Sequence, residues 1–192
     1  MQQAESGAAF GLPRLDIRVK FMPQFTGSAK GVLTFFCGKM GAGKSTKACE
    51  IAQHSNAVLL CEDEWLQSLY PNQIKSLSDY IYYSKQMRPQ IKKLVQSILL
   101  TGTDVVMDFP ANTVPQRNWV KSIFAEIEAF HQLVYIDLPD EVCLAQIRQR
   151  CKEQPERVAT DTAEMFKQVT KHFVSPAMEE GFVVTLVTRA KL

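Results

Sequence analysis

The chain has 192 residues, 46% of them apolar and 22% charged, which is the balance of an ordinary globular protein and fits one domain. Its 22 Lys and Arg residues against 20 Asp and Glu residues give a net charge of +2, too even for a nucleic-acid coat or a polybasic membrane anchor. No apolar stretch reaches the ~18 residues that span a bilayer, and the N-terminus has no signal-peptide pattern, so we expect a cytoplasmic protein without a membrane segment.

Residues 1–31 differ in composition from the rest, with many Gly, Ser, Ala and Pro residues. The alternation of polar and apolar residues over Asp16–Phe21 fits an edge strand, whereas the surrounding composition fits a disordered leader. Both interpretations stay open from the sequence, and we expect the main domain over residues 32–192.

From residue 32 onward, apolar runs of strand length alternate with stretches of helical period. We expect strands at residues 32–37, 57–61, 103–108, 133–137 and 182–187. We expect helices at residues 44–54, 65–70, 74–101, 115–130, 139–152 and 161–178. Pro89 disfavours helical geometry at Arg88, so the 74–101 segment is either two helices or one kinked helix. This alternation predicts an α/β fold with a parallel sheet between two layers of helices, and such sheets bind ligands beyond the carboxyl ends of their strands.

The five cysteines and three histidines form neither a disulfide framework nor a zinc site. The cysteines are odd in number, widely spaced and without a C-x-x-C pair, and the histidines are scattered. We therefore interpret the cysteines as free thiols in a reducing compartment; they are Cys37, Cys49, Cys61, Cys143 and Cys151.

The junction between the first main strand and the first main helix carries a phosphate-binding pattern. It matches G-x-x-x-x-G-K-[ST] through Gly38, Lys39, Met40, Gly41, Ala42, Gly43, Lys44, Ser45 and Thr46. Successive backbone N–H groups of such a loop point at phosphate oxygens, at the positive end of the helix dipole. The pattern assigns Lys44 to the β- and γ-phosphates and the Ser45 hydroxyl to the metal, and it predicts a purine nucleoside triphosphate and Mg²⁺ as ligands. We take ATP as the nucleotide.

Other classes of nucleotide-binding protein fit less well than a kinase. No N-K-x-D box for guanine recognition is present, and the Val105–Asp108 run is followed by Phe109 rather than by the glutamate of a motor ATPase. An imitation of that Asp-Glu signature occurs at Leu59–Glu64, but on the strand directly after the loop helix. Phosphoryl transfer needs a cradle, a metal, a positioned acceptor and cations over the transferred group, and the sequence offers candidates for each.

Two carboxylates follow predicted strands. Asp63 is our candidate for the base that orients or deprotonates an acceptor hydroxyl, with Glu62 and Glu64 as substitutes and helix capping as the alternative for all three. Asp108 is a candidate to hold Mg²⁺ or to contact the acceptor.

Two sets of arginines are the candidate cations. Arg148, Arg150 and Arg157 fall near residues 148–160, where a lid lowers cations onto phosphates, although such a run also fits a solvated face; Arg150 is our choice. Arg117, at the start of a predicted helix, is a candidate substrate contact or a structural residue.

Taken together, these segments resemble the small P-loop kinase family. Its relatives include AAA-type ATP-binding proteins, zeta-toxin-like kinases, chloramphenicol phosphotransferase, gluconate and shikimate kinases, and the kinase domain of polynucleotide kinase. The resemblance covers about residues 32–187 and is carried by Gly38–Thr46, Glu62–Leu66, Val105–Phe109, Arg117, and Tyr135–Pro139 leading to Arg148 and Arg150.

The resemblance implies a three-layer P-loop kinase-like fold with a five-stranded parallel sheet of order 2-3-1-4-5, and ATP-dependent transfer of phosphate to an alcohol. It implies Asp63 as the base, Lys44 and Ser45 as phosphate and metal residues, and Arg150 as the lid cation. We expect a small hydroxylated acceptor, because no groove of basic and aromatic residues indicates a nucleic acid. A polynucleotide 5′-hydroxyl kinase and a nucleotide-dependent switch or ATPase acting on a protein partner are the alternatives.

Overall fold

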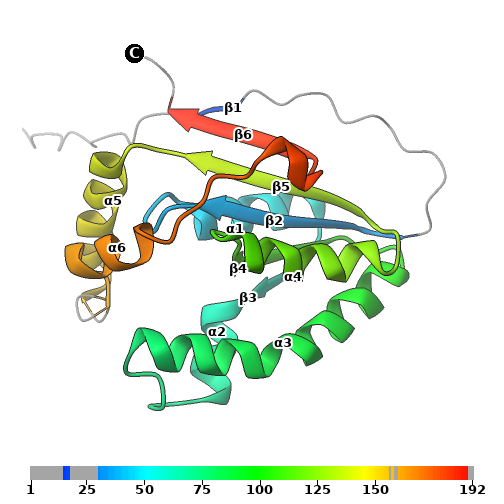
Figure 1. Cartoon of the computed structure of the whole chain (residues 1–192), viewed down its shortest axis with the longest axis horizontal. Coiled ribbons are helices and arrows are strands. Elements are labelled where there is room, and N and C mark those ends of the chain that lie inside the picture. The colour runs from blue at the N-terminus through cyan, green and yellow to red at the C-terminus, as the bar shows by residue number, and fades with distance from the viewer. Residues whose placement is uncertain (1–14, 18–29, 156, 158–159, 190–192) are drawn as a thin grey trace, which may run out of the picture.

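The computed structural model describes residues 15–17, 30–155, 157 and 160–189, which build one sheet and the helices around it (Figure 1). The strands are β1 (Leu15–Ile17), β2 (Val32–Gly38), β3 (Val58–Cys61), β4 (Val105–Pro110), β5 (Phe130–Asp137) and β6 (Val184–Arg189). The helices are α1 (Lys44–Ser55), α2 (Glu62–Leu69), α3 (Leu77–Leu100), α4 (Val114–Ala125), α5 (Asp140–Glu153), α6 (Ala163–Thr170) and the short 3₁₀ helix η2 (Met178–Glu180).

The sheet has six strands in the order β1-β6-β5-β2-β4-β3. The five strands from β2 onward are parallel, and their order, counted along the chain from residue 32, is 2-3-1-4-5. The predicted fold class is therefore confirmed. The sixth strand is β1, which pairs antiparallel with β6 so that Leu15 lies opposite Arg189.

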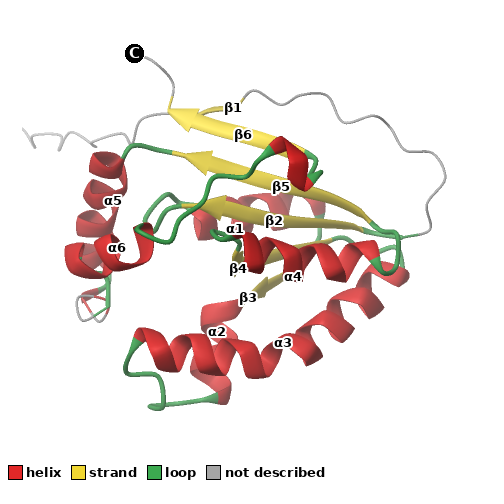
Figure 2. Ribbon diagram, viewed as in Figure 1, coloured by secondary structure: helices red, strands yellow, loops and turns green. Residues whose placement is uncertain are grey.

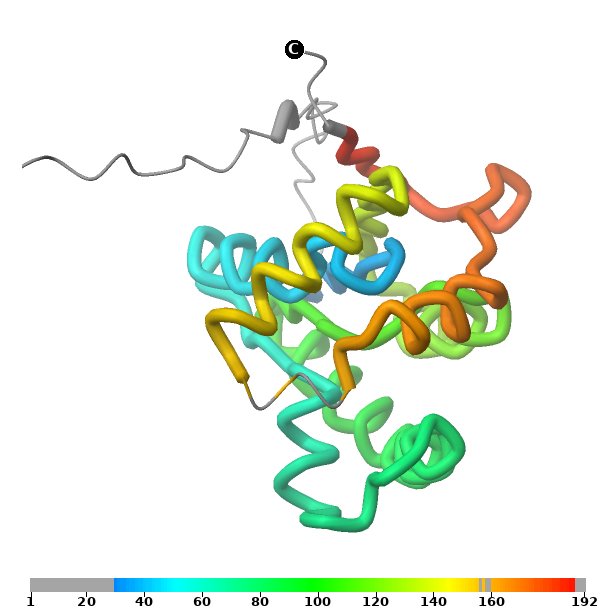
Figure 3. The backbone as a smooth tube through the Cα atoms, turned by 90° about the vertical axis from the view of Figure 1, so that its left-hand side faces the viewer, coloured from blue at the N-terminus to red at the C-terminus, as the bar shows by residue number. Residues whose placement is uncertain are grey.

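Helices cover both faces of this sheet (Figure 2). One core cluster packs α3 and α4 against side chains such as Phe35 and Met107, while a second packs α1 and α5 against Phe36 and Val134. Neighbouring residues Phe35 and Phe36 face opposite layers because side chains alternate along a strand. The view in Figure 3 looks along the layers, with α1 and α4 on opposite sides. Among the described residues, no helix is long and apolar enough to cross a membrane.

Two predicted helices end earlier in the structure than expected. The helix expected over 115–130 ends at Ala125, because β5 begins at Phe130 and pairs with β2 along its whole length, from Val32 opposite Phe130 to Gly38 opposite Ile136. The helix expected over 161–178 is wrong beyond Thr170. Pro176 disfavours helical geometry at Ser175, and the chain there runs extended to η2.

Of the two alternatives for the segment around Pro89, two helices or one kinked helix, the structure shows one helix. Residues Leu77–Leu100 form α3 with Pro89 in its interior, and Figure 1 shows the helix bending along its length. Ser76 caps its start by accepting a hydrogen bond from the backbone N–H of Asp79 at 3.2 Å.

The N-terminal segment contributes the edge strand that the sequence left open. Of the expected Asp16–Phe21 run, only Asp16 and Ile17 belong to β1, which begins one residue earlier at Leu15; residues 18–21 lie outside the described residues.

Candidate active site

The carboxyl end of β2 turns sharply into α1 through the predicted phosphate loop, residues 38–46. Gly41 and Gly43 have φ angles of 75° and 90°, in the left-handed region that favours glycine. Gly41 also lies against α5, where an added Cβ would stand 2.6 Å from the carbonyl oxygen of Cys143. Backbone geometry and close contact with α5 therefore fix the conformation of the loop.

Lys44 is folded onto this loop. Its ammonium group donates hydrogen bonds to the carbonyl oxygens of Gly38 and Lys39, at 2.7 and 3.0 Å. Burial lowers the pKa of Lys44, and the nearby Asp108 carboxylate opposes that shift. Ser45 and Thr46 are exposed at the first turn of α1, and the Lys39 side chain pairs with Asp140 of α5.

A residue that the sequence reasoning missed ties the loop to β4. The Asn112 side-chain oxygen accepts a hydrogen bond from the backbone N–H of Gly38 at 3.0 Å. The backbone N–H of Asn112 in turn donates to the side-chain oxygen of Gln116 at 2.9 Å, within the capping box that starts α4. The sequence did carry a signal for this residue, because Asn112 lies two residues after the apolar strand and directly before the Thr113–Gln116 capping box.

Asp108 and Asp63 come to the same edge as the loop. In the ladder between β3 and β4, Cys61 lies opposite Asp108, and the Cys61 thiol donates to Asp108 Oδ2 at 3.8 Å. Burial raises the pKa of Cys61 to about 11, so the thiol is neutral and able to donate. Asp108 is half-buried, and β4 lies between β3 and β2 in the sheet.

The acidic run Glu62–Glu64 forms the first turn of α2, and its members have different surroundings. Asp63 and Glu64 are exposed, whereas Glu62 is only 2% exposed. Glu62 accepts hydrogen bonds from Tyr80 Oη at 2.5 Å and from Ser84 Oγ at 2.6 Å, both on α3. Tyr80 Oη also lies 3.2 Å from Asp63 Oδ1.

Burial and charge set the protonation tendencies of this group. Burial raises the pKa of Glu62, and the hydrogen bonds from Ser84 and Tyr80 work against that rise. Burial, followed by the two neighbouring carboxylates, holds the pKa of Tyr80 well above its ordinary value, so the phenol keeps its hydrogen. The sequence did not reveal that Glu62 pairs with Tyr80 and Ser84, because these two residues lie 18 and 22 positions after Glu62 in the chain.

Arg150 of α5 is held by Asp161. Its guanidinium contacts Asp161 at 2.7 Å, and Arg157 contacts the same carboxylate oxygen at 3.0 Å. The charge of Arg150 contributes to lowering the pKa of Lys44, so the guanidinium is within electrostatic reach of the loop lysine. Arg148, two residues earlier on α5, is exposed.

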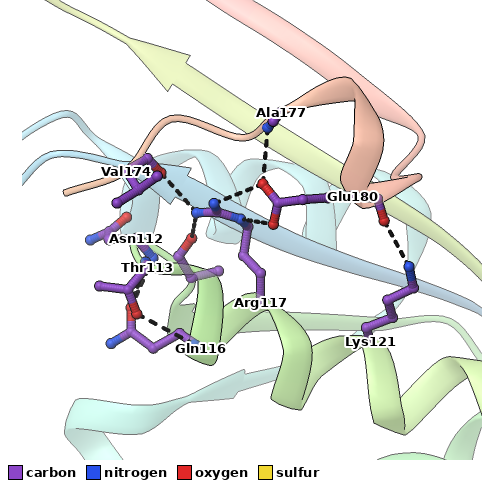
Figure 4. Close-up of polar contacts among 9 residues, drawn as sticks. Asn112, Thr113, Gln116, Arg117, Lys121, Val174, Ala177 and Glu180 are labelled. Carbon is purple, nitrogen blue, oxygen red and sulfur yellow. Dashed lines mark hydrogen bonds and ion pairs between the residues drawn. The ribbon is translucent and has the colours of Figure 1, made fainter.

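Arg117 does not have the surroundings expected of a substrate contact. Its side chain is 0% exposed and forms two hydrogen bonds to the Glu180 carboxylate, at 2.7 and 2.8 Å (Figure 4). Its remaining nitrogen donates to the carbonyl oxygens of Val174 and Ala111, at 2.8 and 3.2 Å. The guanidinium therefore joins α4 to the segment before β6, and the substrate role expected for Arg117 is not supported.

The profile of a family described as an AAA domain matches residues 33–175, well over half of the chain. The chain belongs to this AAA domain family. No match was found among curated proteins.

Solved structures share the fold of this AAA-family chain at low sequence identity. The Mycobacterium tuberculosis APS kinase CysC, in complex with AMPPNP and APS, has a TM-score of 0.60 and 15% identity, with 86% of this chain and 92% of that one covered. A candidate kinase from Chloroflexus aurantiacus has a TM-score of 0.64 and 16% identity, with 84% and 87% covered. The Pnkp1/Rnl/Hen1 RNA repair complex has a TM-score of 0.56 and 18% identity, with 80% of this chain and 49% of that one covered. The AAA-family chain therefore shares the fold of these P-loop kinases.

In this AAA-family chain the loop, Asp108 and Asp63 lie at the carboxyl ends of the neighbouring strands β2, β4 and β3. Among the described residues, no cluster of three or more His, Cys, Asp or Glu is arranged to hold a metal ion. An open groove of about 310 Å³ lies elsewhere, along α1 and β3 from Cys49 to Leu59, and none of the predicted site residues lines it.

Proposed function

We propose that the protein is an ATP-dependent phosphotransferase that moves the γ-phosphate of ATP to a hydroxyl group of a small molecule. The observation that carries the proposal is the order of three neighbouring strands, β2, β4 and β3. Their carboxyl ends carry the phosphate loop, Asp108 and Asp63 in that sequence across one edge of the sheet. A nucleotide held at the first and an acceptor held at the last would meet over the middle strand.

Nucleotide binding is assigned to the phosphate loop. The backbone of Gly38–Thr46 would wrap the phosphates, with the Lys44 ammonium exchanging its carbonyl partners for β- and γ-phosphate oxygens. Ser45 and Asp108 fit Mg²⁺, because they offer a hydroxyl and a carboxylate oxygen and Mg²⁺ in such sites takes one or two protein ligands plus phosphates and water. When bound, Mg²⁺ would neutralise charge on the phosphates.

Acceptor activation is assigned to Asp63. It is exposed, at the start of α2, and can accept the proton of an acceptor hydroxyl. Asp108 is the second carboxylate within reach of the acceptor. We assign Arg150 to the transferring phosphate, in a lid near residues 148–160, because its charge already acts on Lys44.

The acceptor is to be found with a panel chosen from the structural neighbours. The M. tuberculosis neighbour is an APS kinase and another neighbour is part of an RNA repair complex, so APS and an RNA 5′-hydroxyl belong in the panel beside sugars and aminated or hydroxylated antibiotics. The experiment follows transfer of labelled γ-phosphate from MgATP to each compound.

Asp63→Asn should lower the transfer rate about 10²–10⁴-fold, the usual contribution of a general base. Glu64→Gln is the matched control, because it removes the same charge from the next residue of the same turn, and it should leave the rate within about twofold. Arg150→Ala should lower the rate far more than Arg148→Ala. Release of free phosphate on addition of a protein partner, with no phosphorylated compound in the panel, would favour the nucleotide-dependent switch instead.

A further inference from the structure

Behind Asp63 lies a chain of oxygen atoms that the phosphotransfer mechanism above does not use. It runs from Asp63 Oδ1 to Tyr80 Oη over 3.2 Å, and from Tyr80 Oη to Glu62 Oε2 over 2.5 Å. Ser84 Oγ closes its far end by donating to Glu62 Oε1 at 2.6 Å. Only the Asp63 end is exposed, while Glu62 and Ser84 are buried.

The number of hydrogens limits which of these oxygen atoms can be joined by hydrogen bonds at one time. Tyr80 has one phenolic hydrogen and two carboxylate neighbours, so it can donate to only one of them. The shorter contact assigns that hydrogen to Glu62. The phenol oxygen then offers a lone pair toward Asp63. With the Tyr80 hydrogen directed at Glu62, the 3.2 Å contact between Tyr80 and Asp63 is a hydrogen bond when Asp63 carries a proton.

We propose that Tyr80 and Glu62 form a proton relay behind Asp63, which passes the proton taken from the acceptor through the Tyr80 hydroxyl to the Glu62 carboxylate. The inference rests on the proposed phosphotransfer and adds to it a place where the proton goes. Asp63 remains the catalytic residue, and Tyr80 and Glu62 act through it as positioning and proton-storing residues.

The acceptor O–H bond breaks and its electron pair forms the new O–P bond, while the bond between the γ-phosphorus and the bridging oxygen breaks and leaves its pair on ADP. The proton goes to Asp63 and then to Tyr80 Oη, as the hydrogen of Tyr80 moves to Glu62 Oε2. Asp63 becomes a carboxylate again, and the proton returns by the same path to water after the products leave.

The surroundings of Glu62 suit a group that both holds and releases a proton. Burial favours its neutral form, as does the charge of Asp63 on the same helix. The hydrogen bonds from Tyr80 and Ser84 and the charge of Arg88, all on α3, favour its ionised form. These two sets of effects on the pKa of Glu62 oppose one another. Of the three α3 side chains that favour the ionised form, Tyr80 is the one within hydrogen-bond distance of Asp63 among the described residues.

Two variants test the relay through the rate. Tyr80→Phe removes the bridging hydroxyl, and Glu62→Gln keeps partners for Tyr80 and Ser84 but cannot store a proton. The probe is release of inorganic phosphate from MgATP with water as the acceptor, measured between pH 5 and 9. Each variant should lower the rate about tenfold or more, with the KM for ATP unchanged, and the double variant should be no slower than either single one. Tyr83→Phe is the matched control, because that hydroxyl on the same helix bonds to Gln73 instead, and it should match the wild type.

A second measurement needs no activity. The titration of the Glu62 carboxyl is followed by carbon-13 NMR in the whole chain, with and without Asp63→Asn. Removing the Asp63 charge should lower the pKa of Glu62 when Tyr80 is present, and by less than half as much in the Tyr80→Phe background. Equal effects in both backgrounds, or a Glu62→Gln rate within twofold of wild type, would overturn the relay. Failure of every compound in the acceptor panel would instead overturn the proposed function and leave the coupling measurement standing on its own.

Discussion

At the scale of single residues, Arg117 shows how burial changes the meaning of a charged side chain. From sequence it stands at the start of a helix beyond a strand end, where substrate contacts are expected. In the fold its donors are taken by Glu180 and by two backbone carbonyl groups, with no exposed surface left. A guanidinium in that position contributes to function by fixing the segment that carries η2 against α4.

Arg117→Ala should lower the free energy of unfolding by about 3 kcal/mol, because it removes one member of a buried pair and leaves two carbonyl groups without their donor. Urea denaturation at pH 7 measures the change. Lys92→Ala, which breaks the ion pair with the exposed Glu126, is the control and should change the stability little. A loss of transfer activity in Arg117→Ala without any loss of stability would contradict this structural role.

The same pair makes stability depend on pH. Hydrogen bonding to Arg117 lowers the pKa of Glu180 from its ordinary value of 4.5. The folded state therefore binds fewer protons than the unfolded state, so the contribution of this pair is fully present above pH 4.5 and is lost as the pH falls through the lowered pKa. Urea denaturation between pH 7 and pH 3 should show a smaller acid-induced loss in Arg117→Ala than in the wild type.

At the scale of elements, the phosphate loop depends on how closely α5 packs against it. Gly41→Ala would place a methyl group 2.6 Å from Cys143 O and from Ile147 Cγ1, at a φ of +75°. Gly43→Ala has a similar φ of +90° but open space, with its nearest atom at 3.8 Å. We expect Gly43→Ala to cost about 1 kcal/mol of stability from backbone strain alone, and Gly41→Ala about 3 kcal/mol because α5 must also move.

Thermal unfolding of the two variants beside the wild type measures this difference. The comparison is matched, since both changes add one methyl group to a left-handed glycine of the same loop. If Gly41→Ala and Gly43→Ala lose equal stability, α5 can move aside at no cost in free energy. The close packing of α5 against Gly41 would then not stabilise the loop.

The elements also show which features a sequence reveals. The glycine-containing turn after β2, the five parallel strands and α1 rest on local patterns, namely the glycine spacing and continuous apolar runs, and their positions in the fold agree with the prediction. The ends of α4 and α6 were not predicted correctly. The first depends on the pairing of Phe130 with Val32, and the second on the hydrogen bond from the backbone N–H of Val174 to the carbonyl oxygen of Asn112. Likewise, which carboxylate of Glu62–Glu64 is buried depends on Tyr80 and Ser84, and the partner of Arg117 is 63 residues away.

At the scale of the whole molecule, the proposed site divides its tasks between strands. The loop after β2 would bind the nucleotide, and α2 after β3 would supply the base, with β4 between them. A change in the base should therefore lower the transfer rate without weakening nucleotide binding, and a change in the loop should weaken nucleotide binding. Ligand binding to the folded state alone raises its stability by RT ln(1 + [L]/Kd), about 2.7 kcal/mol at 100 times the Kd.

MgATP at about 100 times its wild-type Kd should stabilise the wild type and Asp63→Asn equally, by about 2.7 kcal/mol, because Asp63 takes no part in holding the phosphates. Lys44→Ala loses a charge-assisted contact worth about 2 kcal/mol, so its stabilisation at the same ATP concentration should fall to about 1 kcal/mol. Lys47→Ala, one turn along α1 and paired with Glu50, is the control and should respond like the wild type. Urea denaturation with and without MgATP gives all four values. If Asp63→Asn abolished the stabilisation, the acidic turn of α2 would be part of the nucleotide site, and the division of tasks across the sheet would be wrong.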